Sequence, residues 1–281
     1  MSKKVLVFGP RSWIASYCRE LFIKNGVIWL EAAVDIRLKS AVKERIDHYR
    51  PNVILNFAAC GHRPMDQDRY EIFDVNFNGI RNIIDSAPDD TPIIQAGTGL
   101  EGKSQTPYAL TKLKATKELM KRGNATVLRL FNVYGEREPN RRLFPTLVRH
   151  MRRGEYPPLG NPDVQHDWIH AEEVSLYFWR ASHFKGNAQS FDVGKGVSWS
   201  LEETTEVFNK HFKVTDSPKW NCYHTPFAML NYKANTINAH DKLGIVNLFS
   251  FQEGVERYVD RYDAPDWHEE SELDIEYSYA R

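Results

Sequence analysis

A tyrosine and a lysine, Tyr108 and Lys112, are spaced four residues apart in a segment with a helical pattern. On a helix this spacing puts both side chains on one face, where an ammonium group would favour the phenolate and give an acid or base that works near neutral pH. The Y-x-x-x-K spacing is also common on solvated helices. Here, however, the segment follows an apolar run that ends at Thr98, whose hydroxyl would lie at the end of a strand. Thr98, Tyr108 and Lys112 are therefore our candidate catalytic set.

The first turn of the chain, G-P-R-S-W-I-A from Gly9 to Ala15, is a second candidate site. A dinucleotide-binding turn ideally has glycines at positions 9, 12 and 15, for the tight turn, for backbone approach to the pyrophosphate and for helix–sheet packing. Ser12 and Ala15 replace two of them, and they are the smallest available substitutes. The turn is thus predicted to seat a pyrophosphate at a helix N-terminus. The alternative is a strand–helix turn that binds nothing.

The elements that must position these residues follow a regular alternation. Apolar runs at 3–9, 27–30, 53–59, 93–96 and 127–131 alternate with helix-like segments at 12–24, 38–49, 67–87 and 108–122. Alternating strands and helices predict an α/β fold with a doubly wound parallel sheet that is covered on both faces. Thr98 would then end a central strand of this sheet.

The alternation stops near Tyr134, where loops rich in proline and charge begin. Short helical patterns at 143–152, 172–182, 201–211 and 251–262 are mixed there with isolated strands such as 190–193. We predict a dinucleotide-binding domain over 1–134, mainly a smaller, irregular α/β substrate-binding lobe over 135–262, and an acidic tail over 263–281. Since ligands in doubly wound sheets bind outside the carboxyl ends of the strands, the expected site lies between the two lobes.

Composition excludes several classes of protein. The 281 residues include 37 basic and 37 acidic side chains, so no net charge would attract nucleic acid or an anionic membrane surface. We find neither a signal-peptide pattern nor an apolar run long enough to span a membrane, and we predict a cytoplasmic protein. The three cysteines form no C-x-x-C pair and the ten histidines are dispersed, so no metal site is expected.

Several motifs, in the same order along the chain, resemble the extended short-chain dehydrogenase/reductase family of nucleotide-sugar epimerases, dehydratases and ketoreductases. The matching segments are Val5–Gly9, Asp35–Arg37, Pro51–Ala59, Asp74–Gly79, Leu128–Gly135, Gln165–His170 and Phe191–Gly196. The segment from Leu128 to Gly135 is a near-verbatim match to L-R-x-F-N-V-Y-G, and it is the most specific of them.

The resemblance implies a Rossmann-type fold, NAD or NADP as the cofactor, and a nucleotide-diphosphate sugar as the substrate. Tyr108 would exchange a proton with the sugar oxygen, Thr98 would hydrogen-bond that oxygen, and Lys112 would hold the nicotinamide ribose. The resemblance assigns to cofactor binding Gly9, Arg11, Ser12, Trp13, Ile14, Asp35, Ile36, Phe57, Ala58, Ala59, Tyr108, Lys112, Phe131 and Val133, and to substrate binding Arg63, Asn132, Arg141, Leu143, Phe144 and His166.

Two departures from the family pattern narrow the function. His166 stands where the family has an arginine that clamps the diphosphate, and Arg141 or Arg142 would be the substitute. The 4,6-dehydratases carry Asp-Glu directly after the catalytic threonine, whereas here Thr98 is followed by Gly-Leu and then Glu101. We therefore predict a 4-epimerase or a 4-keto-sugar reductase. The alternative is a non-catalytic sensor or scaffold of the same fold.

Two properties depend on less specific residues. Glu31 would favour NAD by binding the ribose diol, whereas Arg11 and Arg37 would favour NADP by binding its 2'-phosphate, and both cofactors stay open. The helices at 67–87 and 108–122 resemble those that pair between subunits in the family. We therefore predict a homodimer, with a partner surface that includes Ile72, Ile80, Ile83 and Leu119.

Overall fold

The computed structural model describes residues 2–61, 68–222 and 232–262. The chain forms two compact units. Unit 1 comprises Met1–Leu130, Val174–Val193 and Thr236–Ile245, and unit 2 comprises Phe131–Glu173, Gly194–Asn235 and Val246–Arg281. The sequence suggested one boundary near residue 134. The chain instead passes between the units several times, because a late strand returns to the sheet of unit 1. The proposed acidic tail lies outside the described residues.

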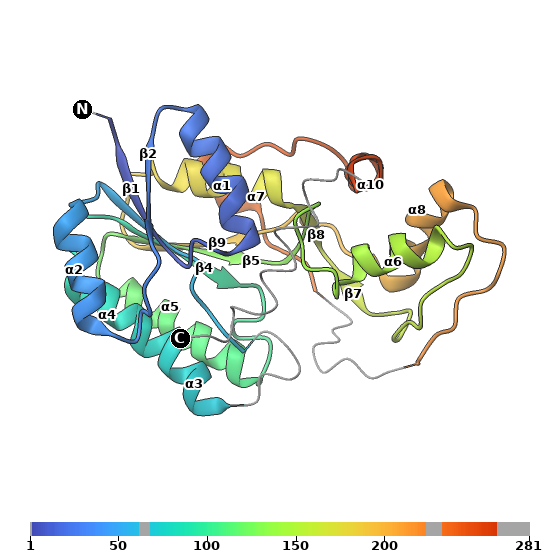
Figure 1. The fold of residues 1–281 in the computed structure, drawn as a ribbon, viewed down its shortest axis with the longest axis horizontal. Helices are drawn as coiled ribbons and strands as arrows, with labels where there is room; N and C mark the ends of the chain where they lie inside the picture. The colour runs from blue at the N-terminus through green and yellow to red at the C-terminus, as the bar shows by residue number, and fades with distance from the viewer. Residues whose placement is uncertain (1, 62–67, 223–231, 263–281) are drawn as a thin grey trace. The chain divides into compact units, whose positions relative to one another are not determined.

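Unit 1 contains a six-stranded parallel sheet in the order β2-β1-β3-β4-β5-β9 (Figure 1). Its strands are β1 (Lys4–Phe8), β2 (Ile28–Ala32), β3 (Val53–Asn56), β4 (Ile93–Thr98), β5 (Ala125–Leu130) and β9 (Gln189–Val193). The inner strands are almost wholly buried, as the continuous apolar runs predict for a sheet with two covered faces. The predicted doubly wound α/β fold is confirmed.

Helices cover both faces of this sheet (Figure 1). On one face lie α2 (Lys39–Tyr49), α4 (Gly79–Ser86) and α5 (Pro107–Met120), whose buried Ile46, Ile83 and Leu119 pack in one core with the strands. On the other face lie α1 (Trp13–Lys24) and α7 (Ala171–Ala181), where Phe22 and Trp179 meet edge to face at 5.1 Å between ring centroids. The catalytic candidates on α5 are thus carried by a firmly packed helix.

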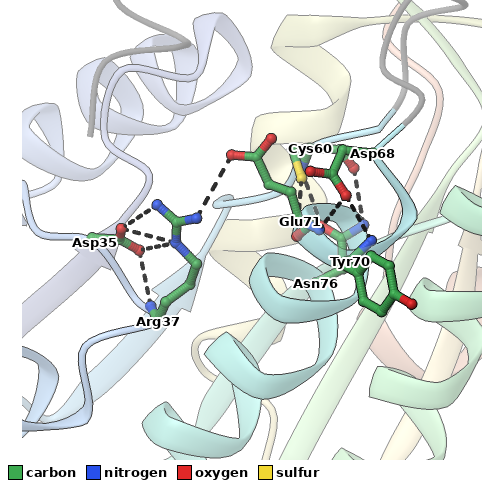
Figure 2. Close-up of polar contacts among 7 residues, drawn as sticks. All are labelled: Asp35, Arg37, Cys60, Asp68, Tyr70, Glu71 and Asn76. Carbon is green, nitrogen blue, oxygen red and sulfur yellow. Dashed lines mark hydrogen bonds and ion pairs between the residues drawn. The ribbon is translucent and has the colours of Figure 1, made fainter.

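The segment predicted as one helix over 67–87 is interrupted by a π-helical turn. It consists of α3 (Arg69–Phe73), the π-helix η1 (Asp74–Asn78) and α4. Asp68 caps its start by accepting hydrogen bonds from the backbone N–H groups of Tyr70 and Glu71 (Figure 2). A π-helical turn inserts an extra residue into a helix and is frequent at functional sites.

The direction of the strand order reverses between β1 and β3, and the first turn lies at this point. Gly9 follows β1 with φ of +69°. A Cβ atom on Gly9 would lie 2.4 Å from the backbone nitrogen of Ala58, just after β3. Only glycine accepts both the left-handed backbone and this close approach. The predicted need for a glycine at position 9 is confirmed.

Unit 2 is smaller and irregular, and it is built around an aromatic core. The strands β6 (Asn132–Tyr134) and β8 (Trp168–His170) pair in parallel, and β7 (Gln165–His166) and β10 (Trp199–Ser200) pair antiparallel. The helices α6 (Leu143–Met151), α8 (Leu201–Phe212) and α10 (Phe251–Arg261) contribute to the core, and both α8 and α10 begin with a capping box. The helix α9 (Ile237–Leu243) belongs to unit 1.

Among residues 2–61, 68–222 and 232–262, no helix combines the length and the apolar character that crossing a bilayer requires.

Candidate active site

The three catalytic candidates meet at the carboxyl end of β4. Thr98 is the last residue of this strand, and the Tyr108 side chain is hydrogen-bonded to the Thr98 side chain. Thr106 caps α5 by accepting from the Ala109 backbone N–H at 3.3 Å, and Pro107 occupies the first turn. The Thr106 cap and Pro107 thus fix the start of α5 at the position that places Tyr108 next to Thr98. The structure thus brings together the two residues that the sequence placed at a common site.

Lys112 lies one turn further along α5, with 2% of its surface exposed. Its Nζ donates to the Ala96 backbone oxygen on β4 at 2.5 Å. Burial lowers the pKa of Lys112 to about 8, although the negative charge of Glu101 opposes this shift. The Gln95 side chain donates to the same Ala96 oxygen and accepts from Asn56, so this contact is part of a buried network. An ammonium with a pKa near 8 can lose its proton within the physiological range.

The phenol of Tyr108 is held in its protonated form. Burial raises the pKa of Tyr108 above its usual value, the charge of Glu101 raises it further, and the hydrogen bond with Thr98 acts in the opposite direction. The expectation that Lys112 would favour the phenolate is wrong for the protein without ligands, because desolvation of the phenol is the larger effect. In this state Tyr108 is a proton donor.

A side chain that the sequence did not single out fixes the loop beside this set. Asn76, in the π-helical turn, accepts from the Cys60 backbone N–H at 3.0 Å and donates to the Cys60 backbone oxygen at 2.9 Å (Figure 2). It also donates to the Thr111 hydroxyl, next to Lys112 in the chain, at 3.1 Å. Asn76 therefore ties the loop after β3 to α5. Its signal was the V-N-x-x-G motif, which was recognised only as part of the family pattern.

The dinucleotide-binding candidates line up along the first turn. The Ser12 backbone N–H donates to the Gly9 oxygen at 3.1 Å, and α1 begins at Trp13. Ser12 makes no side-chain hydrogen bond to the first turn of α1. Ala15 is fully buried, which suits the close helix packing expected at this position. Arg11 is exposed, and Ile14 is half-buried.

Two other segments contain residues that the sequence proposed for cofactor binding. Phe57, Ala58 and Ala59 follow β3, and the Asn56 side chain accepts from the Ala58 backbone N–H at 3.0 Å. Ile36 is buried in the core of unit 1 at 3% exposure. The first three of these residues thus follow the carboxyl end of β3, and Ile36 follows that of β2.

Asp35 and Arg37 form a close ion pair after β2. Arg37 donates to both carboxylate oxygens of Asp35, with Nη2 at 2.6 Å from Oδ2, and its Nη1 lies 3.7 Å from Glu71 Oε1 on α3 (Figure 2). The bond to Arg37 lowers the pKa of Asp35, and the same pairing raises the pKa of Arg37. Arg37 is therefore engaged by two carboxylates.

The substrate candidates of unit 2 have different settings. Asn132 begins β6, and its Oδ1 is buried without a hydrogen-bond partner among the described residues. Arg141 is exposed and Leu143 is half-buried. Arg142 donates to Glu138 and to the Val133 backbone oxygen, both at 2.7 Å, so its guanidinium holds the loop before α6. Arg142 is thus a poor substitute for a diphosphate clamp.

Three of the remaining candidates are buried, and the fourth is not described by the structure. Phe144 is fully buried against Tyr134, Trp168 and Phe208, so its side chain packs the core and has no surface to offer a ligand. Phe131 and Val133 are buried as well. Arg63 lies outside the described residues.

His166 lies on β7, where its ring stacks on Trp168 at 4.7 Å between centroids and 26° between planes. Burial lowers the pKa of His166 to about 4. The imidazole is therefore neutral at neutral pH in the protein without ligands. Next to it, Asp167 accepts from the backbone N–H groups of Lys195, Gly196 and Ala234 and so holds these loops in place.

Comparison with known proteins defines the class. The sequence profile of the NAD dependent epimerase/dehydratase family matches residues 5–194. Since this span is more than half of the chain, the chain belongs to that family. No curated protein sequence matches the chain.

Solved structures share the fold at low sequence identity. The UDP-glucose 4-epimerase of Thermotoga maritima, solved with UDP-glucose, is 17% identical, with a TM-score of 0.84 over 94% of this chain and 99% of that chain. The UDP-glucose 4-epimerase of Thermus thermophilus, solved with NAD, is 19% identical, with a TM-score of 0.81 over 93% and 99%. The ADP-L-glycero-D-manno-heptose-6-epimerase of Helicobacter pylori is 18% identical, with a TM-score of 0.80 over 94% and 97%.

Proposed function

We propose that the chain is an NAD-dependent enzyme that acts on the sugar C4 of a nucleotide-diphosphate sugar, as a 4-epimerase or a 4-keto-sugar reductase. The observation that carries this proposal is the hydrogen bond between Thr98 and Tyr108 at the end of β4, with Lys112 one turn further along the same helix. Two of the similar structures are UDP-glucose 4-epimerases. A third similar structure is a heptose-6-epimerase, which acts at a different carbon of its sugar. The choice of C4 as the reacting carbon therefore depends on the resemblance of the sequence motifs.

The residues of the first turn fit a nicotinamide dinucleotide. Gly9 lets the backbone pass close to Ala58, and the first turn of α1 is not capped by the Ser12 side chain. A helix N-terminus at such a turn favours an anion such as the pyrophosphate, because its backbone N–H groups and its dipole point toward the ligand. The cofactor would supply or accept a hydride when bound.

NAD is favoured over NADP by the state of Arg37. A 2'-phosphate would have to displace Asp35 and Glu71 from this guanidinium, and both carboxylates would repel it. Glu31, the last residue but one of β2, is exposed. In calorimetry we expect NAD to bind at least ~10-fold more tightly than NADP, which corresponds to about 1.4 kcal/mol. Glu71→Gln is expected to improve NADP binding and leave NAD binding unchanged; equal affinities in the native protein would contradict this choice.

The side chains divide the chemistry among themselves. Tyr108, protonated at rest, gives its proton to the sugar oxygen during reduction of a keto group and takes it back during oxidation of the alcohol. Thr98 hydrogen-bonds to the same oxygen and orients it. Lys112 holds the nicotinamide ribose and keeps a positive charge near the phenol while it is protonated.

The nucleotide sugar would be held by residues of unit 2. The buried Oδ1 of Asn132 has a free acceptor position among the described residues, which suits a donor on the ligand. We assign Arg141, Leu143 and His166 to the same task, and Arg63 by the family pattern alone. His166 would act as a neutral hydrogen-bonding and stacking group, because its pKa is about 4.

The test is turnover of defined sugars by the purified protein. Nucleotide sugars with and without a 4-keto group are incubated with NAD(H) or NADP(H), and NMR of the sugar is followed together with absorbance at 340 nm. An epimerase converts the hydroxyl sugar with no net change in cofactor, and a reductase consumes reduced cofactor with the keto sugar. If the protein binds cofactor but converts no sugar of the panel, the sensor or scaffold alternative holds.

We also propose a homodimer, on a surface that differs from the predicted one. Ile72, Ile80, Ile83 and Leu119 are buried in unit 1 itself, so they are not available to a partner. Tyr70 on α3 and Leu110 on α5 are instead 89% and 44% exposed. Light scattering at micromolar concentration is expected to show a dimer that Tyr70→Asp with Leu110→Asp dissociates, whereas Ile237→Asp on α9 does not. A native monomer would refute the proposal.

A further inference from the structure

Glu101 is a buried carboxylate beside the catalytic set that the reaction described above does not use. It lies three residues after Thr98 and is 6% exposed. Its Oε1 accepts from the Thr98 backbone N–H at 2.9 Å, and its Oε2 accepts from the Thr116 hydroxyl at 2.8 Å. One side chain therefore links the end of β4 to the middle of α5.

The strand beneath Glu101 is shaped to receive it. A Cβ atom on Gly97 would lie 2.7 Å from Glu101 Oε1. The Glu101 carboxylate therefore fits against β4 only because residue 97 has no side chain. Both hydrogen-bond partners donate, which is the pattern that an ionised carboxylate requires. Burying a carboxylate is unfavourable without such partners. If this position served only to fill the core, an apolar side chain would stabilise the fold at least as well, so the carboxylate indicates a further role.

Charged groups face Glu101 from two elements. Lys112 on α5 and Arg129 on β5 both act on it electrostatically, and Arg129 is paired with Asp192 on β9 at 2.7 Å. Burial raises the pKa of Glu101, while the two hydrogen bonds and the two cations oppose this shift. The charge of Glu101 in turn acts to raise the pKa values of Tyr108 and Lys112. Cys60 also acts to raise both pKa values, by a smaller amount.

We propose that Glu101 is a positioning residue of the active site. Its buried carboxylate ties the strand that carries Thr98 to the helix that carries Tyr108 and Lys112, and its negative charge opposes the loss of a proton from either of these two side chains. This inference rests on the proposed function. Glu101 acts through Thr98, Tyr108 and Lys112.

The charge has a consequence for the direction of proton transfer. Reduction of a keto sugar requires the protonated phenol and the protonated amine. With a pKa near 8 for Lys112, the rate of this step is expected to fall as the pH rises above about 8. Without the Glu101 charge, both protons leave at lower pH, so the same fall begins earlier.

The experiment compares three variants in single-turnover reduction of a 4-keto nucleotide sugar, as a function of pH. Glu101→Gln keeps the shape and an acceptor for Thr98 but removes the charge. We expect the rate of Glu101→Gln to begin to fall about one pH unit below the pH at which the native rate falls. Above the Lys112 pKa of the native protein, the variant is therefore expected to react ~10-fold more slowly, with an unchanged KM. Glu101→Asp keeps the charge but is too short to reach both partners, so its rate is expected to drop while its pH profile stays in place. Glu118→Gln, the same change at a surface pair with Lys121 on this helix, is the control.

The outcomes separate this inference from the function on which it rests. A native pH profile in Glu101→Gln overturns the inference and leaves the function standing, as does a Glu101→Asp profile shifted like that of Glu101→Gln. NMR of ¹³C-labelled tyrosine, with the Tyr108 signal assigned by Tyr108→Phe, gives the phenol pKa without substrate. A lower Tyr108 pKa in Glu101→Gln supports the inference even if no sugar is turned over, and an unchanged one overturns it. If Glu101→Gln does not fold, Thr116→Val removes one bond but no charge, and an altered pH profile in that variant overturns the inference.

Discussion

The two units bury charged side chains in different ways. In unit 1, the charge of the buried Glu101 acts on the buried Lys112 and on Tyr108, a residue that is half-buried as a whole and is hydrogen-bonded to Thr98. In unit 2, the buried carboxylates have partners within the unit: Glu136 lies 3.3 Å from His170, and Glu138 lies 2.7 Å from Arg142. Burial and an altered pKa therefore do not by themselves mark a catalytic site, because ion pairs that hold loops in place also shift pKa values.

Glu138 illustrates the second case. Burial raises its pKa to about 7, which on its own would mark a candidate acid or base. Its Oε2, however, accepts from Arg142, which also donates to the Val133 backbone oxygen. Glu138 thus stabilises the loop before α6, as Asp167 stabilises the loops that carry Lys195 and Ala234.

The largest effect on stability is expected in the aromatic core of unit 2. Phe144→Ala removes a fully buried ring that contacts Tyr134, Trp168 and Phe208. We expect a loss of about 3–5 kcal/mol in the free energy of unfolding, measured with urea. Leu248→Ala, at a side chain of unit 2 that is 51% exposed, is the control and is expected to change it by less than ~0.5 kcal/mol. Similar losses in the two variants would contradict the buried role given to Phe144.

A glycine pair tests the first turn of unit 1. Gly9 and Gly102 both have positive φ, but only at Gly9 would a Cβ atom meet backbone, whereas no atom lies within 4 Å at Gly102. Gly102→Ala is expected to cost about 1 kcal/mol for the left-handed backbone alone. Gly9→Ala is expected to cost more and also to weaken dinucleotide binding by ~10-fold or more, measured by calorimetry. Equal dinucleotide affinity in both variants would place the cofactor elsewhere.

The smallest effect is expected at His166. With a pKa of about 4, this ring stays neutral from pH 6 to 8, so it gives substrate affinity no pH dependence over that range. His166 is therefore not a charged clamp for the substrate diphosphate over this pH range. Because the unfolded chain takes up this proton near pH 6.5, the free energy of unfolding falls as the pH drops from about 6.5 to 4. His166→Gln is expected to reduce that fall. A substrate affinity that drops between pH 6 and 8 in the native protein, but not in His166→Gln, would show that His166 is charged when substrate binds and would contradict this prediction.

Much of unit 1 follows from sequence periodicity. The strands and helices before residue 130 were predicted to within a few residues, because buried parallel strands are continuous apolar runs and the helices between them are amphipathic. Thr98, Tyr108 and Lys112 were identified because their types and spacing match a known chemistry. Asn76 and Glu101 were not, since each acts through contacts with residues far along the chain or on another element.

Unit 2 was less predictable for physical reasons. Its strands have two or three residues, which is too short for a period of two to be recognised, and its order comes from ring packing around Tyr134. The role of Phe144 was misread because a family motif gives position in the chain and not burial. The burial of the His166 ring comes with its stacking on Trp168. This contact could not be predicted from the fact that the two residues are two positions apart in the sequence.

One pair of variants tests the proposed role of Tyr108 as the group that exchanges the proton of the reaction. Tyr108→Phe keeps the ring and removes only the hydroxyl, and Tyr70→Phe makes the same change at a side chain that is 89% exposed. Turnover of the nucleotide sugar is compared with NAD affinity in each. We expect Tyr108→Phe to lose turnover by roughly 10²-fold or more while NAD binding persists, and Tyr70→Phe to match the native protein. Native turnover in Tyr108→Phe would contradict the account.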